Sequence, residues 1–109
     1  MAKKIYKLRY LPLFSKDLEE KLLYITEKLR NPQAANELLD AVEKSIIERL
    51  PDADKFEEYH SIKERTYPYY RIYVKNFVVY YVVINDTERE SIMEVRRFLY
   101  ARQNKDDII

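Results

Sequence analysis

Residues 69–84 form the most continuous β-strand pattern in the chain. They are almost all β-branched or aromatic, and only Lys75 and Asn76 interrupt the run. β-Branched and aromatic side chains fit a pleated, half-buried surface, and Asn tolerates the positive φ of a tight two-residue turn. The pattern therefore predicts a β-hairpin with strands over residues 69–74 and 77–84.

The register of this hairpin follows if Val74 faces Phe77. One face is then apolar or aromatic, and we expect it in the core: Tyr70, Ile72, Val74, Phe77, Val79 and Tyr81. The other face combines Arg71 and tyrosines with Val78. Arg71 is then either a solvated strand arginine stacked on its neighbours or an anchor for phosphate or carboxylate.

Two helices are predicted upstream of the hairpin. Residues 4–11 alternate as a half-buried strand that Pro12 ends. Leucines and isoleucines at helical spacing then predict a helix over residues 15–30, with Ser15 as its N-cap. Asn31 and Pro32 punctuate the chain, and we expect them to cap and begin a second helix that runs to residue 50.

A last strand is predicted over residues 91–100, after a polar loop over 51–60, a lead-in over 61–67 and a charged loop over 85–90. Strict alternation would place Glu94, Arg96, Phe98 and Tyr100 on one face. The order β-α-α-β-β-β predicts an α+β fold, with an N-terminal helical hairpin packed on one face of a small, largely antiparallel four-stranded sheet. We expect a single domain over residues 1–109, with 104–109 as a loose tail.

Composition excludes several classes of function. The chain has no cysteine and no glycine, so thiolate chemistry, Cys-based zinc sites and Gly-rich phosphate loops are ruled out. It has one histidine, and we expect no metal and no cofactor. A net charge of +1 predicts no direct DNA binding by this chain alone. Its apolar runs are too short for a membrane span, no signal peptide is evident, and we expect a cytoplasmic protein.

The predicted open face of the sheet carries the candidate chemistry. Basic and aromatic side chains gather there: Lys63, Arg65, Arg71, Tyr73, Tyr80, Arg96 and Tyr100, with Arg102 just beyond. This mixture suits RNA, where guanidinium groups meet phosphates and rings stack on bases. It also suits a protein interface, where Tyr and Arg are the enriched anchors, and these residue types slightly favour protein contact. A bare solvated sheet face is the third possibility.

Four stretches, in order and at characteristic spacing, resemble one known family. They are Tyr-Lys-Leu-Arg-Tyr at 6–10 with Phe-Ser-Lys-Asp-Leu at 14–18; Asn-Pro-Gln-Ala-Ala at 31–35 with Leu-Leu at 38–39; Tyr-Arg at 70–71 with Phe-Val-Val-Tyr-Tyr at 77–81; and Val-Arg-Arg-Phe-Leu-Tyr-Ala-Arg at 95–102. Together they resemble the RelE/ParE superfamily, the toxins of bacterial type II toxin–antitoxin systems, including those of the plasmid-stabilisation type. The resemblance covers roughly residues 4–104.

The resemblance implies a growth-arresting toxin that a cognate antitoxin neutralises. RelE-like members cut mRNA on the ribosome, and ParE-like members inhibit DNA gyrase. If the chain is a ribonuclease, the resemblance makes Arg71, Arg96, Tyr100 and Arg102 its catalytic candidates. The ribonuclease members of the family tend to have an arginine near the start of the second hairpin strand, and this element is absent here, since that position is close to Val78. The set is therefore incomplete, and whether the protein is an enzyme stays open.

The hairpin and the closing Phe-Leu-Tyr-Ala-Arg segment look more like the ParE branch. We therefore expect a ParE-like toxin that binds gyrase through a face formed by Lys63, Arg65, Arg71, Tyr73 and Tyr80. The alternatives are a ribosome-dependent mRNA endoribonuclease (an mRNA interferase) and a non-toxic interaction module.

Overall fold

The computed structural model describes residues 4–59, 66–85 and 87–103. The elements follow one another as β1 (Ile5–Tyr10), α1 (Pro12–Leu23), a π-helical segment η1 (Tyr24–Lys28), α2 (Pro32–Arg49), a 3-10 turn η2 (Leu50–Asp52), β2 (Glu58–Tyr59), β3 (Tyr69–Val74), β4 (Phe77–Asn85) and β5 (Glu90–Tyr100). The predicted α+β class and element order are confirmed.

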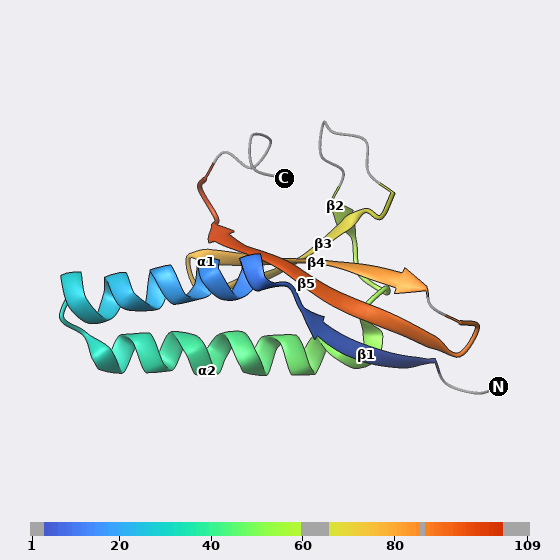
Figure 1. Cartoon of the computed structure of the whole chain (residues 1–109), viewed down its shortest axis with the longest axis horizontal. Helices are drawn as coiled ribbons and strands as arrows, with labels where there is room; N and C mark the ends of the chain where they lie inside the picture. The colour runs from blue at the N-terminus through green and yellow to red at the C-terminus, as the bar shows by residue number, and fades with distance from the viewer. Residues whose placement is uncertain (1–3, 60–65, 86, 104–109) are drawn as a thin grey trace.

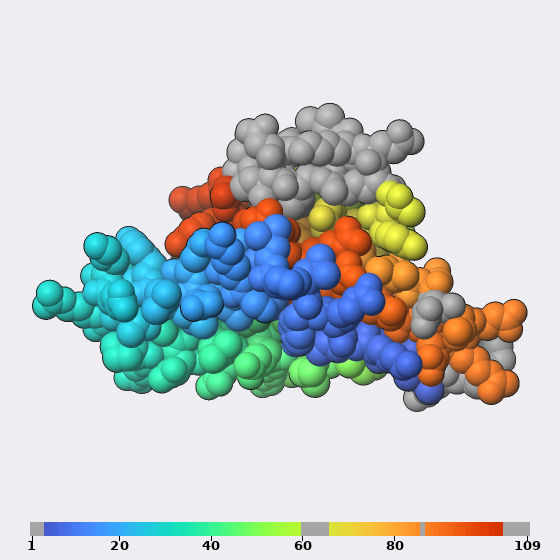
Figure 2. Space-filling view, viewed as in Figure 1, coloured from blue at the N-terminus to red at the C-terminus, as the bar shows by residue number. Residues whose placement is uncertain are grey.

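The sheet has five strands in the order β1-β5-β4-β3-β2. β1 runs parallel to β5, and every other pairing is antiparallel. The predicted count of four strands is wrong by one, because the two-residue strand β2 lies within the segment expected to be a loop. Helices α1 and α2 lie antiparallel and side by side (Figure 1), and the space-filling view shows α1 resting directly on α2 (Figure 2).

The predicted register of the β3–β4 hairpin is confirmed at every pair, from Val74 opposite Phe77 to Tyr70 opposite Tyr81. The turn differs in one respect. Lys75, not Asn76, takes the positive φ, at 54°. Left-handed backbone is unfavourable for a residue with a Cβ, so the strand pairing on both sides holds Lys75 in this conformation.

The helix boundaries are partly as expected. Asn31 caps α2 as predicted, since its side-chain oxygen accepts a hydrogen bond from the backbone N–H of Ala34 at 3.1 Å. The predicted N-cap of the first helix is wrong. α1 begins at Pro12, with Leu11 as N-cap and no side-chain capping bond. Proline suits a first helical turn because its missing N–H would have no intrahelical partner there.

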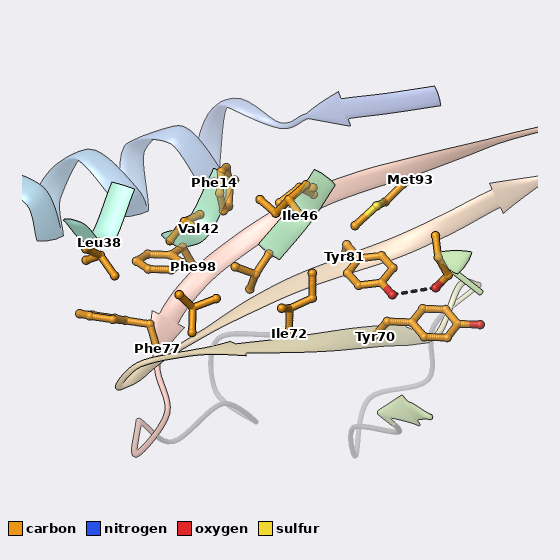
Figure 3. Packing of buried hydrophobic residues seen from close by; sticks show 14 residues of the cluster. Phe14, Leu38, Val42, Ile46, Tyr70, Ile72, Phe77, Tyr81, Met93 and Phe98 are labelled. Atoms are coloured by element: carbon orange, nitrogen blue, oxygen red, sulfur yellow. Dashed lines mark hydrogen bonds between the residues drawn. The ribbon is translucent and has the colours of Figure 1, made fainter. Parts of the chain in front are cut away.

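The main core lies between the helices and one face of the sheet. It buries the apolar stripe of α2, Phe14 of α1, and the predicted core face of the hairpin (Figure 3). Phe77 and Phe98 stack with ring centroids 4.9 Å apart, and Phe14 meets Phe98 edge-on at 6.1 Å. Apolar burial of this extent is the dominant favourable contribution to folding.

A β-bulge changes the faces of β5. Tyr81 pairs with Val95 but Tyr80 pairs with Arg97, so Arg96 is an extra residue in the ladder. A bulge of this kind breaks the strict alternation of side chains. Val95 and Phe98 therefore both enter the main core, and the expected grouping of Phe98 and Tyr100 with Glu94 and Arg96 is wrong.

The second face of the sheet, opposite the helices, is less open than expected. Its centre is a smaller buried cluster of Tyr69, Val78, Tyr80, Val82 and Leu99, on which Tyr59 and Tyr67 pack. The expectation of an open Tyr/Arg face fails at Tyr80, which is 0% exposed. It holds at Tyr73, which is 60% exposed.

Candidate target-binding face

Strands β2, β3 and β4 place an arginine among tyrosines on the second face. The guanidinium carbon of Arg71 lies 4.7 Å from the ring centroid of Tyr59 and 5.7 Å from that of Tyr73. Arg71 is half-buried and stands opposite Tyr80 in the hairpin register. The stacking fixes a planar group of donors at a sheet surface, which is the arrangement that suits recognition of an oxyanion.

Tyr80 lies beneath this layer of side chains. Its ring is 6.0 Å from that of Tyr59 and 5.9 Å from that of Tyr69, measured between centroids. Its hydroxyl is buried and has no hydrogen-bond partner among the residues that the structure describes. Burial raises the pKa of Tyr80 above its usual value, with smaller raising contributions from Tyr59 and Tyr73, and a lowering one from Arg71. The group therefore remains a neutral O–H donor near neutral pH.

Arg96 also lies on the second face, but its guanidinium is hydrogen-bonded to Glu94. The buried carboxylate of Glu94 accepts hydrogen bonds from Arg9 Nε at 2.8 Å and from Arg96 Nε at 2.8 Å. Burial alone would raise the pKa of Glu94, but the hydrogen bonds from Arg9 and Arg96 outweigh it and hold this pKa below its usual value. Glu94 is thus an ionised counter-ion for two arginines.

Tyr100 and Arg102 lie elsewhere. Tyr100 pairs with Phe77, and its ring centroid is 4.9 Å from that of Phe77 and 5.2 Å from Nζ of Lys21 in α1. It is therefore on the helix side of the sheet, because of the bulge at Arg96. Arg102 lines an open pocket beside the hairpin turn, together with Tyr100. The four catalytic candidates are consequently not brought together at one site.

Lys63 and Arg65, the other two residues of the expected binding face, lie outside the described residues. The described part of that face is Arg71, Tyr73 and Tyr80. We call these three residues, with Tyr59 and Tyr69, the tyrosine–arginine face.

Sequence reasoning missed a buried ion pair that ties α1 to β5. Asp17 accepts two hydrogen bonds from Arg97, at 2.7 and 3.0 Å, and a third from the backbone N–H of Phe98 at 3.0 Å. No local pattern indicates this pair, because Asp17 and Arg97 are 80 positions apart in the sequence.

An apolar groove lies on the helical side of the molecule. It is lined by Tyr10, Phe14, Ser15, Leu18, Val42, Glu43, Ile46 and Ile47. Ile47 is 56% exposed and Tyr10 is 42% exposed at this groove. Large apolar side chains exposed together mark an interaction surface more often than a solvated one. Among the described residues, no helix is long and apolar enough to span a bilayer.

The comparisons with known proteins agree with this fold. Among solved structures, the chain is similar to a chain of a structure described as the chromosomal ParDE toxin–antitoxin system from P. aeruginosa. The TM-score is 0.66 and the sequence identity 12%, over 88% of this chain and 96% of that chain. At this identity the likeness shows the fold alone. No curated protein matches the chain.

The family model for the ParE toxin of the type II toxin–antitoxin system parDE matches residues 8–104. This match spans all of α1, α2 and β2 to β5, and the second half of β1. The protein therefore belongs to the ParE toxin family of type II toxin–antitoxin systems.

Proposed function

We propose that this toxin arrests bacterial growth by binding DNA gyrase, and that it acts in the cytoplasm. The observation that carries the proposal is the separation of the candidate catalytic residues within a ParE-family chain. Tyr100 lies on the helix side of the sheet and Arg71 on the other, while Arg96 is held by Glu94. General acid–base catalysis needs the acid within hydrogen-bond reach of the reacting group, so this geometry favours a binding surface over an RNA-cleaving site.

Purified gyrase provides the test. Added toxin should inhibit supercoiling of relaxed plasmid, and induction of the toxin in cells should damage DNA while mRNA stays intact. Lys44→Gln, an exposed change on α2, is the matched control and should inhibit as wild type does. Unimpaired supercoiling under a large excess of toxin would overturn the proposal. New mRNA 5′ ends within translated codons would instead support the ribosome-dependent ribonuclease.

We also propose that the cognate antitoxin binds in the apolar groove between α1 and α2. The groove is lined mainly by apolar side chains and fits the apolar face of an amphipathic segment that folds on binding. Ile47→Glu places a charge on this surface and should weaken antitoxin binding by at least about 10-fold, the usual effect of losing an interface anchor.

The same variant distinguishes the two surfaces of the toxin. Ile47→Glu should still inhibit gyrase, because Ile47 lies on α2 and the tyrosine–arginine face lies across the sheet. Titration calorimetry with the antitoxin and the supercoiling assay measure the two effects. Equal antitoxin affinity in wild type and variant would exclude this groove as the docking site.

A further inference from the structure

We infer that Arg71 and Tyr80 form a subsite for a single carboxylate, supplied by an acidic side chain of the toxin's protein target. The inference rests on the proposed function, in which the target is a protein. It adds the chemical group that the tyrosine–arginine face recognises and the two residues that bind it.

Arg71 differs from the other arginines of the strands. Arg9 and Arg96 are hydrogen-bonded to Glu94, and Arg97 is hydrogen-bonded to Asp17. In the described part of the chain, Arg71 makes ring contacts but no ion pair. A half-buried guanidinium without a counter-ion is unfavourable, and a bound carboxylate would supply one.

Tyr80 provides a second polar group at the same place that has no hydrogen-bond partner among the described residues. Its hydroxyl is buried without a partner, and leaving such a group unpaired costs about 1 to 3 kcal/mol. Tyr81, its neighbour in the sequence, shows the usual solution: its hydroxyl donates to the Ala53 carbonyl at 2.7 Å and accepts from Arg49 at 3.0 Å. The Tyr80 hydroxyl is thus an unused donor, and a ligand atom can bind it once the side chains that cover it move aside.

The hairpin brings the two groups together. Arg71 and Tyr80 are directly paired across β3 and β4, so both side chains leave the sheet on the same face from Cβ atoms about 4.5 to 5.5 Å apart. Tyr59 contacts both of them, the guanidinium at 4.7 Å and the ring of Tyr80 at 6.0 Å. A carboxylate has two acceptor oxygens, one for the guanidinium and one for the hydroxyl.

The charge of the face favours a carboxylate over a nucleic acid backbone. Arg9 and Arg96 both contact the buried Glu94, so among these three arginines Arg71 is the one that no described carboxylate contacts. Nucleic acid binding draws its affinity from several phosphate contacts. One cation flanked by aromatic rings fits one acidic side chain in a protein interface.

The test uses the full-length toxin and sodium acetate as the probe, followed by NMR of arginine Nε–H and tyrosine ring signals. Acetate should shift the signals of Arg71 and Tyr80 saturably. Tyr80→Phe should weaken this binding several-fold, and Arg71→Gln should abolish it. Tyr24→Phe and Arg89→Gln, at exposed positions, are the matched controls and should leave it unchanged.

Gyrase provides the second arm. Each of Arg71→Gln and Tyr80→Phe should reduce gyrase affinity at least 10-fold. Because both residues bind the same carboxylate, the fold-loss of affinity in the double variant should be smaller than the product of the two single fold-losses. Absence of acetate-dependent shifts, or binding of inorganic phosphate without binding of acetate, would overturn the carboxylate subsite. So would inhibition of gyrase by both variants at wild-type strength, and in that case the proposed function would stand. If wild type binds acetate at this site but does not bind gyrase, the proposed function fails and the carboxylate subsite stands.

Discussion

The two faces of the sheet are built from neighbouring residues but satisfy their polar groups differently. On the helix-covered face, the Tyr81 hydroxyl donates a hydrogen bond to the Ala53 carbonyl, drawn as a dashed line in Figure 3, and accepts one from Arg49. On the second face, the adjacent Tyr80 is equally buried, yet its hydroxyl has no partner. Among the described residues, the Tyr81 hydroxyl is thus hydrogen-bonded within the protein and the Tyr80 hydroxyl is not.

This difference indicates which face of the sheet is available to bind a target. Folding strongly disfavours buried polar groups without partners, so a face completed by its own helices has little left to offer a ligand. The second face keeps an exposed Tyr73 and an Arg71 without a described counter-ion. Unused donors, more than residue types, distinguish the candidate binding face from the structural one.

The largest expected loss of stability comes from removing the Asp17–Arg97 ion pair, which joins α1 to β5. Asp17→Ala leaves Arg97 and the Phe98 N–H without their shared acceptor. Removing one partner of a buried ion pair typically costs about 3 to 5 kcal/mol, and urea unfolding should show a loss of this size. Lys16→Ala, at the exposed neighbouring position, should change stability by no more than about 0.5 kcal/mol. A loss of stability in Asp17→Ala no larger than in Lys16→Ala would show that the Asp17–Arg97 ion pair does not anchor α1 to the sheet.

The two tyrosines give the most direct test of the contrast. Tyr81→Phe leaves the Ala53 carbonyl without its donor and removes an acceptor from Arg49, and should lower the free energy of unfolding by about 1 to 3 kcal/mol. Tyr80→Phe removes a hydroxyl that makes no hydrogen bond and should leave stability unchanged or raised. Thermal unfolding of both variants measures the difference. Equal losses would mean that the Tyr80 hydroxyl has a structural role.

Glu94 should make the second face sensitive to acid. Its pKa in the folded protein is depressed by Arg9 and Arg96, despite burial. The stabilisation is therefore fully present above the unfolded-state pKa of about 4.3, and is lost as pH falls through the lower folded-state pKa. Glu94→Gln should be less stable than wild type at pH 7, and the gap should narrow on acidification.

Urea unfolding from pH 7 downward measures this gap. Glu43→Gln, an exposed change on α2, is the control. A gap between wild type and Glu94→Gln that stays constant with pH would show that the two arginines do not act through the charge of Glu94.

The smallest effect is expected at the turn that joins β3 to β4, the two strands that carry Tyr80 and Tyr81 and their cross-strand partners. Lys75→Gly removes the Cβ from a residue held at a φ of 54°, and should stabilise the protein by a few tenths of a kcal/mol, up to about 1. Asn76→Gly is the matched control, since Asn76 does not have a positive φ, and it should give no gain. Chemical denaturation resolves the two. A destabilised Lys75→Gly would indicate that the Lys75 side chain contributes contacts that outweigh the backbone cost.

Local sequence signals predicted much of the fold. The period of two in residues 69–84 gave the hairpin register and the core side chains Tyr70, Ile72 and Tyr81. Asn31 and Pro32 marked the start of α2 as expected. Cap and strand signals act within a few residues, so they can be recognised without knowledge of the rest of the chain.

The candidate site was predicted less well. Arg71, Tyr73 and Tyr80 do share a face as expected. Tyr100 does not join them, because the bulge at Arg96 shifts the end of β5 to the other face. A bulge depends on how β4, β5 and α1 meet, and Asp17 binds β5 directly after it. Strict alternation contains no information about such a contact.

By itself, then, the sequence determined the fold class, the hairpin register and the residue types of the candidate face, because periodicity and turn chemistry are local. Only the tertiary structure decided which arginines and tyrosines have partners. Asp17 and Arg97 are 80 positions apart in the sequence and Arg9 and Glu94 are 85 apart, and ion pairs at such separations form only once the sheet has assembled. Among the described residues, the same assembly gives the Arg71 guanidinium ring contacts but no carboxylate partner, and gives the Tyr80 hydroxyl no hydrogen-bond partner.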